Sequence, residues 1–144
     1  SLDQKMFGIF KNTRSAGPDP LLRGFDDQFP IPQSRHTTIK KEDIIKHKDL
    51  KILAESKDIG VSIIKTNDNR AIFMTGHLEY DTETLKTEYV RDVKKGLKIE
   101  IPQNYFPSDD PSKEPYSTWR STAHLFYSNW LNYYVYQETP FNFA

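Results

Sequence analysis

Short apolar runs of strand length dominate the first half of the chain. They cover residues 5–10, 50–55, 61–66 and 71–75, and short turns containing glycine, asparagine or aspartate separate the last three. Runs of this length between turn residues are typical of β-strands. Because the turns are short, we expect these three strands to pair antiparallel.

Two longer segments have the spacing of amphipathic helices. In the first, 82–95, an apolar residue recurs every fourth position at Leu85, Tyr89 and Val93. The second, 117–137, carries so many large aromatic side chains that the sheet or another subunit must cover them. Its predicted apolar face holds the following residues: Trp119, Ala123, Phe126, Trp130 and Tyr134.

Proline marks two long irregular segments, 12–33 and 102–115. The first also carries leucine and phenylalanine, so we expect an ordered loop that packs on the core. Shorter pieces fill the remainder. We expect an extended segment at 34–39, a helical turn at 41–47 and a short edge strand at 97–101.

The composition narrows the class of protein. The chain has 144 residues, the size of one domain, and its 20 Lys and Arg balance its 20 Asp and Glu. This balance provides no attraction toward nucleic acid or an anionic membrane. No apolar run approaches the ~20 residues of a membrane span, and the start shows no secretory signal. We therefore expect a cytoplasmic protein without nucleic-acid or membrane partners.

Cysteine is absent from the sequence. Its absence excludes disulfides, thiolate metal ligands and a cysteine nucleophile within this chain. The chain also begins almost directly on the strand-like run at 5–10. This start leads us to expect a fragment of a longer protein.

The candidate for chemistry lies where the apolar run 71–75 ends. Gly76 follows, and then His77 and Glu79, two residues apart. In extended backbone such residues point to the same side, so the carboxylate can orient the imidazole and stabilise its protonated form. The glycine lets backbone or ligand come close. A base and its orienting group are thus in place, and a nucleophile would complete a triad.

Other roles for the pair stay open at this point. A histidine bonded to a neighbouring carboxylate can be purely structural, and a metal site would need further ligands. His36, His47 and His124 lack ligand spacing, so no metal is expected. Spacing alone leaves the choice between catalysis and packing even.

Three other polar residues can be interpreted without a functional role. Ser34, in the polar segment 34–36, could bind an anion or a polar substrate, although a solvated loop has the same pattern. Lys5, at the edge of a strand, would ordinarily be an exposed charge. Arg91 points away from the apolar stripe of its helix, so periodicity predicts a solvent-facing side chain paired with Glu88 at i−3.

Several longer motifs are spread in order over nearly the whole chain. They are KMFG at 5–8, PLLRGFDD at 20–27, SRHT at 34–37, LAES at 53–56, TGHLEYD at 75–81, NYFPSDDP at 104–111, WRS at 119–121 and NWLNYYVYQET at 129–139. Together they resemble the homoserine O-succinyltransferase family, acyltransferases of methionine biosynthesis of which some members use acetyl-CoA.

The resemblance implies an α/β fold like that of the class I glutamine amidotransferases, a flavodoxin-like three-layer fold, with residues 1–144 as its C-terminal part. It also implies a catalytic Cys–His–Glu set without a bound cofactor. The cysteine takes the acyl group from succinyl-CoA or acetyl-CoA as a thioester, which the hydroxyl of L-homoserine then attacks. By position in the motifs, His77 matches the general base and Glu79 its orienting carboxylate.

The same motifs imply substrate contacts. Arg91 matches the arginine that holds the substrate, and Ser34 and Lys5 match substrate-binding residues. A guanidinium suits the homoserine carboxylate, which conflicts with the solvent-facing position that periodicity predicts. In the family, the nucleophilic cysteine precedes the segment that matches Lys5. The missing N-terminal half is therefore an expected partner, and this chain alone is expected to be inactive.

Alternatives remain for function and assembly. The sequence does not separate an acetyl from a succinyl donor. A second hypothesis is a non-catalytic binding or assembly module that dimerises through the aromatic helix at 117–137, and a homodimer is also expected for the enzyme. A third is another amidotransferase-like hydrolase that uses the same His-x-Glu pair.

Overall fold

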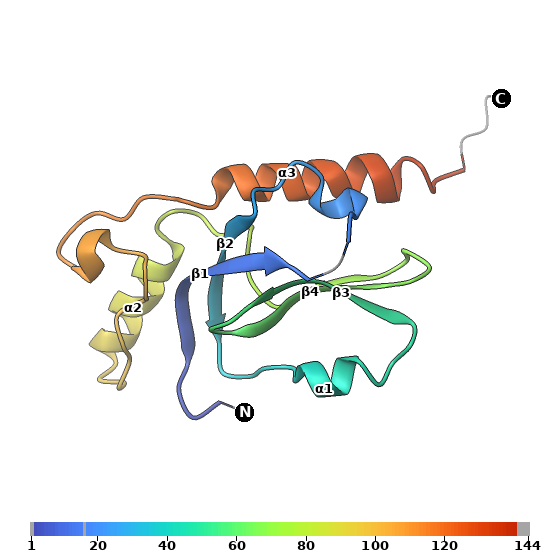
Figure 1. Ribbon diagram of the computed structural model, residues 1–144. Helices are drawn as coiled ribbons and strands as arrows, with labels where there is room; N and C mark the ends of the chain where they lie inside the picture. The colour runs from blue at the N-terminus through green and yellow to red at the C-terminus, as the bar shows by residue number, and fades with distance from the viewer. Residues whose placement is uncertain (1, 16, 141–144) are drawn as a thin grey trace.

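Five β-strands form one sheet in the computed structural model, which describes residues 2–15 and 17–140 (Figure 1). Their order across the sheet is β2-β1-β3-β4-β5, and neighbouring strands run antiparallel. The strands predicted at 5–10, 50–55, 61–66 and 71–75 are confirmed, as is the antiparallel pairing of the last three. The strands are β1 (Met6–Arg14), β2 (Gln28–Arg35), β3 (Leu50–Ser56), β4 (Gly60–Thr66) and β5 (Ile72–Met74).

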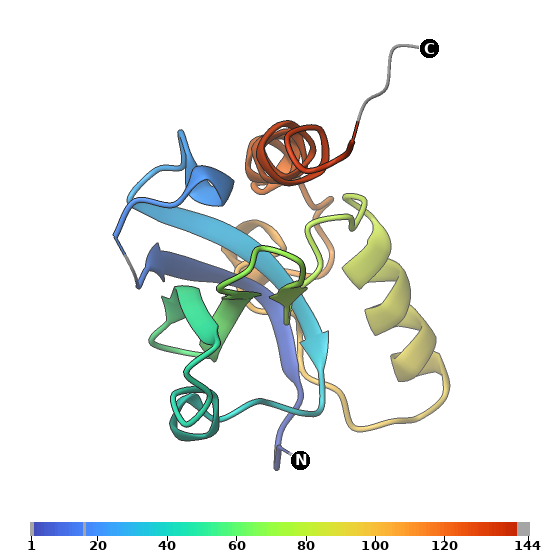
Figure 2. The ribbon, with the colours of Figure 1, turned by 90° about the vertical axis from the view of Figure 1, so that its right-hand side faces the viewer.

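Helices surround this sheet on several sides (Figures 1 and 2). Helix α3 lies along one side and α1 on the opposite side, while α2 stands beside one end. Within the described residues, no helix is both long and apolar enough to cross a membrane. The helical elements are η1 (Pro20–Leu22), α1 (Lys41–Ile44), α2 (Thr84–Lys94), η2 (Pro107–Asp109), α3 (Arg120–Trp130) and a π-helix, η3 (Leu131–Val135).

The two strands β1 and β2 form the longest ladder, whereas β1 meets β3 only through Thr13 and Arg14. Gln103 pairs with part of the edge of β1 that β3 leaves unpaired. Its N–H donates to the carbonyl of Phe7, and its carbonyl accepts from the N–H of Ile9. The late segment that contains Gln103 is thereby joined to the first strand of the sheet.

The irregular segment predicted at 12–33 is shorter than expected, because β1 extends to Arg14 and β2 begins at Gln28. Pro30 and Pro32 did not prevent a strand. They lie on an edge strand, and Pro32 faces Ile9, whose N–H bonds to Gln103 rather than to β2. A proline opposite such a position removes no ladder hydrogen bond.

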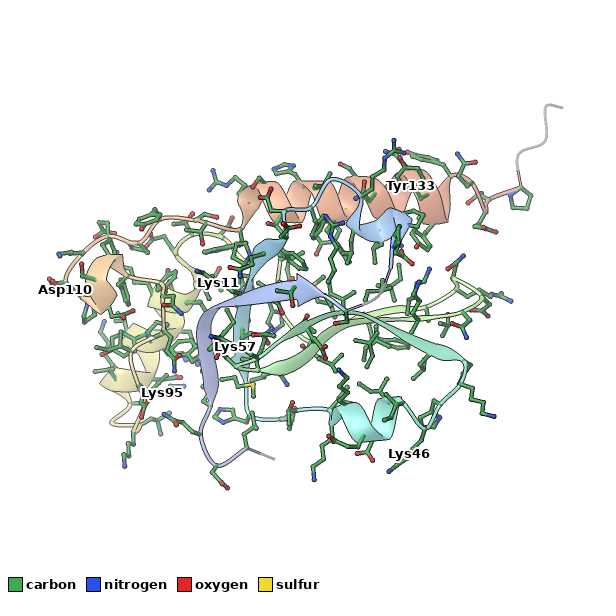
Figure 3. The ribbon with its side chains drawn as sticks, in the orientation of Figure 1. Lys11, Lys46, Lys57, Lys95, Asp110 and Tyr133 are labelled. Carbon is green, nitrogen blue, oxygen red and sulfur yellow. The ribbon has the colours of Figure 1, made fainter. Side chains whose placement is uncertain are left out.

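The loop between β1 and β2 packs into the core, as predicted. Leu21, Leu22 and Phe25 are buried there. The side-chain amide of Asn129 on α3 donates to the carbonyls of Leu21 and Arg23, at 3.0 and 2.8 Å. Arg23 also donates to the hydroxyl of Tyr133 at 2.7 Å, on the side of the helix that faces η1 (Figure 3). These bonds fix the C-terminal helix against the loop.

A buried polar network joins η1, β4 and η3. Lys65 Nζ lies 2.7 Å from Asp19 Oδ2, and the hydroxyl of Tyr134 donates to Asp19 Oδ1 at 2.6 Å. Burial opposes the charge on Asp19, but the hydrogen bonds from Lys65 and Tyr134 outweigh it and hold the pKa of Asp19 below its usual value. The network stabilises the packing of the C-terminal helix on the sheet.

Two predicted apolar faces need correction. Val93 is exposed, and Asp92 is buried with Leu85 on α2 in its place. Trp130 is 40% exposed and Asn129 is buried in its place, whereas Tyr134 is buried as predicted. The step of five residues from Asn129 to Tyr134 exceeds one α-helical turn, and the π-helix supplies the extra residue.

The edge strand predicted at 97–101 is absent from the structure. These residues form an irregular segment between α2 and the bridge at Gln103. Charged residues alternate with apolar ones there, but no neighbouring strand is available to pair with them, because β1 is already bonded to β2 and to Gln103. The predicted helical turn at 41–47 is confirmed in shorter form as α1.

Candidate active site

The turn that follows β5 is pressed against β2. A Cβ on Gly76 would collide with Ile31 Cγ2 and would lie 2.5 Å from Gln33 Nε2 and 2.7 Å from the carbonyl oxygen of Pro32. The N–H of His77 donates to that same carbonyl at 2.9 Å. The close approach expected of Gly76 is therefore an approach to β2, which fixes the point where His77 leaves the sheet.

His77 and Glu79 form the predicted pair. Nδ1 of the imidazole lies 2.8 Å from Oε1 of the carboxylate. The backbone is not extended as expected, because a turn closes here with a 3.3 Å bond from the N–H of Tyr80 to the carbonyl of His77. With Nδ1 bonded to the carboxylate, Nε2 is the nitrogen that can exchange a proton. The two side chains are 36% and 57% exposed, so a substrate can reach them.

Tyr80 adds a second contact to the imidazole. Its ring stacks on that of His77, with centroids 4.4 Å apart and planes 3° from parallel. Burial raises the pKa of the Tyr80 hydroxyl, and the charges of Glu88 and Glu79 raise it further. The phenol therefore stays neutral at neutral pH.

A second polar group is centred on Glu88 of α2. Its Oε1 lies 2.6 Å from Lys5 Nζ, and the hydroxyl of Ser34 lies 2.9 Å from each carboxylate oxygen. Arg91 Nη2 is 3.6 Å from the same Oε1. The three residues matched to substrate binding thus converge on one carboxylate, although they come from the segment before β1, from β2 and from α2.

Arg91 lies as helix periodicity predicts. It is solvent-facing, with 53% of its side chain exposed, and it forms the predicted i−3 ion pair with Glu88. Its Nε donates to Asp92 at 2.6 Å, and this bond, followed by the charges of Asp92 and Glu88, raises the pKa of Arg91. Glu88, one turn earlier on α2, contacts Lys5 and Ser34. The exposed side chain of Arg91 therefore lies beside the point where α2 meets β2 and the segment before β1.

Strand β2 brings the two groups together. The backbone of His77 is bonded to Pro32, and Ser34 contacts Glu88, so the two anchors are only two strand residues apart, roughly 6–7 Å. Tyr80 lies within the electrostatic reach of both Glu79 and Glu88. The His77–Glu79 pair and the Glu88 group are therefore anchored near each other at the end of β2.

Glu88 and Tyr80 are the site residues that the sequence reasoning missed. Glu88 was predicted only as the ion-pair partner of Arg91, because nothing in the spacing of α2 shows that Lys5 and Ser34 reach the same carboxylate. Among residues 2–15 and 17–140, no group of three or more potential metal ligands lies close together.

The fold is similar to that of two solved structures. A protein titled SMU.1228c matches with a TM-score of 0.58 and 16% identity, over 88% of this chain and 51% of that one. A glutamine amidotransferase from Thermotoga maritima matches with a TM-score of 0.51 and 14% identity, over 88% of this chain and 46% of that one. The predicted glutamine amidotransferase-like α/β fold is confirmed, with the described strands forming an antiparallel part of it.

The sequence has close relatives that are named homoserine O-acetyltransferase. The protein of Petrotoga mobilis is 56% identical over 98% of this chain and 46% of its own length. That of Geobacillus kaustophilus is 59% identical over 97% and 46%, and that of Bacteroides fragilis 56% over 99% and 47%. The chain thus spans less than half the length of these relatives. The family model described as homoserine O-succinyltransferase matches residues 1–141. The chain belongs to the homoserine O-succinyltransferase family.

Proposed function

We propose that this chain is the part of a homoserine O-acyltransferase that binds homoserine and holds the general base. The proposal rests on one observation: in a member of this family, two groups of polar side chains are anchored near each other at the end of β2. One group is the His77–Glu79 pair, and the other is the cluster of Lys5, Ser34 and Arg91 around Glu88.

The reaction needs a nucleophile from outside this chain, which has no cysteine. In the proposed reaction, a cysteine thiolate in the N-terminal portion attacks the thioester of acyl-CoA and releases CoA. Homoserine then attacks the new protein thioester through its hydroxyl oxygen. Nε2 of His77 takes the hydroxyl proton, Glu79 stabilises the imidazolium, and the thiolate leaves. The O-acyl ester is the product.

In this proposal, residues of α2 bind homoserine. The guanidinium of Arg91 is suited to the substrate carboxylate. Glu88 is suited to the ammonium group, since a carboxylate held by Lys5 and Ser34 has a fixed direction and free lone pairs. An amino acid with both charges would lie along α2 with its side-chain hydroxyl extending toward His77.

The names of the relatives favour acetyl-CoA over succinyl-CoA as the acyl donor. With either donor, the product would feed the biosynthesis of methionine in the cytoplasm. No resident cofactor takes part in the proposed reaction.

A chimera tests the proposal. This chain replaces the matching portion of the Geobacillus kaustophilus relative, to which it is 59% identical, and CoA release from acetyl-CoA or succinyl-CoA is followed with L-homoserine. We expect the parent chimera to acylate homoserine. His77→Ala should abolish this turnover, and His47→Ala, an exposed control, should leave it intact. Full turnover in the His77→Ala chimera would reject the base assignment, and an inactive parent chimera beside an active intact relative would reject the function.

Glu88→Gln in the same chimera tests substrate recognition. It keeps the size of the side chain but removes the charge, so KM for homoserine should rise about 10- to 100-fold, as expected for a lost charged hydrogen bond of ~1.5–3 kcal/mol. KM for acyl-CoA should not change. Glu42→Gln, on exposed α1, is the matched control. An unchanged KM for homoserine in Glu88→Gln would place the ammonium elsewhere.

A further inference from the structure

The imidazole of His77 needs more than one restraint to aim Nε2. The bond between Nδ1 and Glu79 Oε1, 2.8 Å long, fixes one point of the ring. The ring can still rotate about the line of that bond. Glu79 is itself 57% exposed, so its carboxylate is only weakly held. The pair by itself therefore leaves the direction of Nε2 loosely defined.

The stacked ring of Tyr80 removes this rotation. The two rings are 4.4 Å apart and within 3° of parallel, so any rotation about the Nδ1–Oε1 line would break the face contact. The turn that joins the residues favours the stack, because the N–H of Tyr80 donates to the carbonyl of His77. Glu79 therefore restrains the edge of the imidazole and Tyr80 restrains its face.

Trp119 anchors Tyr80 to the core. Its indole Nε1 donates to the backbone carbonyl of Tyr80 at 2.9 Å, and its side chain is fully buried just before α3. A rigid path thus runs from the core, through the indole and the backbone of the turn, to the plane of the imidazole. The path uses the ring and the backbone of Tyr80 and does not require its hydroxyl.

We propose that Tyr80 is a positioning residue, whose ring fixes the plane of the His77 imidazole and directs Nε2 toward the substrate hydroxyl. This inference rests on the proposed function and deepens it. The charges of Glu88 and Glu79 act on the Tyr80 hydroxyl. Removal of the hydroxyl alone should therefore change the electrostatics slightly, whereas removal of the ring should free the imidazole.

NMR spectroscopy of this chain tests the stack without any assay of activity. The carbon-bound ring protons of His77 should be shifted upfield relative to those of exposed His47, because they lie over the Tyr80 ring. Tyr80→Phe should retain the shift and Tyr80→Leu should lose it. Wild-type shifts that match those of His47 would overturn the proposal, and this comparison needs no variant. Thermal unfolding checks that each variant is folded.

Kinetics in the chimera test the positioning role. Tyr80→Leu should lower kcat about 10- to 100-fold, the effect of a small misplacement of a catalytic group, with KM for homoserine unchanged. Tyr80→Phe should restore kcat to near the parent value. Full kcat in Tyr80→Leu, or an equal loss in both variants, would overturn the proposal. If the parent chimera does not acylate homoserine, the proposed function fails, and the NMR result still decides whether Tyr80 orients His77.

Discussion

Gly76→Ala should destabilise the protein through a single methyl group. Gly76 has no left-handed backbone requirement, so the effect is steric. The added Cβ would meet two buried residues, Ile31 and Gln33, and the carbonyl of Pro32 that accepts from His77. Overpacking costs about 1–3 kcal/mol, and a weakened backbone bond adds ~1 kcal/mol. We expect a total loss of about 2–4 kcal/mol in the free energy of unfolding.

Urea and thermal unfolding, followed by circular dichroism, measure this loss. For a chain of this length, Tm should fall by roughly 5–15 °C. Gly17→Ala is the matched control, since a Cβ there meets nothing within 4 Å, and it should leave stability within about 0.5 kcal/mol. If Gly76→Ala unfolds together with wild type and with Gly17→Ala, the turn is not pressed on β2 and the placement of His77 argued above is wrong.

Two further predictions concern the packing of the C-terminal helix. Asp19→Asn leaves Lys65 buried without its counter-charge and should cost about 3–5 kcal/mol, part of which Lys65→Met should recover in the double variant. The pKa of Asp19 in the folded protein lies below its unfolded value of about 3.9. The ionised carboxylate therefore stabilises wild type above about pH 3.9, and this stabilisation is lost as the pH falls through the folded pKa. Urea unfolding between pH 6 and pH 2 measures this effect. The free energy of unfolding should fall less steeply with decreasing pH in Asp19→Asn than in wild type, and equal slopes would contradict the network. Asn129→Ala removes two bonds to loop carbonyls and should cost about 1–3 kcal/mol, measured in the same way, whereas an unchanged stability would show that the helix does not hold the loop.

Local patterns were sufficient to predict β1, β3, β4 and β5 and the pairing of the last three. The runs at 50–55, 61–66 and 71–75 lie between short turns, so neighbours in sequence are also neighbours in the sheet. The pair of His77 and Glu79 was predictable for the same reason, since its members are two residues apart. The predicted backbone was wrong, because Gly76 presses on β2 and the chain turns there instead of continuing as a strand.

Features that depend on distant segments were not predictable from periodicity. Pro30 and Pro32 suggested a loop, and a strand tolerates them because β2 is an edge strand and the N–H of Ile9, opposite Pro32, bonds to Gln103. The buried face of the last helix also departs from the regular repeat. Asn129 is buried before Tyr134 in place of Trp130, and no spacing of apolar residues in the sequence predicts the π-helix that supplies the extra residue between them.

Glu88 shows why an exposed position in a helix pattern is not evidence against a site. Helix periodicity describes a helix that packs on one surface, and by that rule Glu88 and Arg91 face solvent. Here Lys5 and Ser34 approach the same helix from a second direction. The carboxylate is consequently only 19% exposed, although its neighbour Arg91 is more than half exposed. The Glu88 carboxylate is thus held by Lys5, from the segment before β1, and by Ser34 of β2, and it lies beside the exposed guanidinium of Arg91. The substrate role proposed for Arg91 is therefore compatible with the solvent-facing position that periodicity predicts.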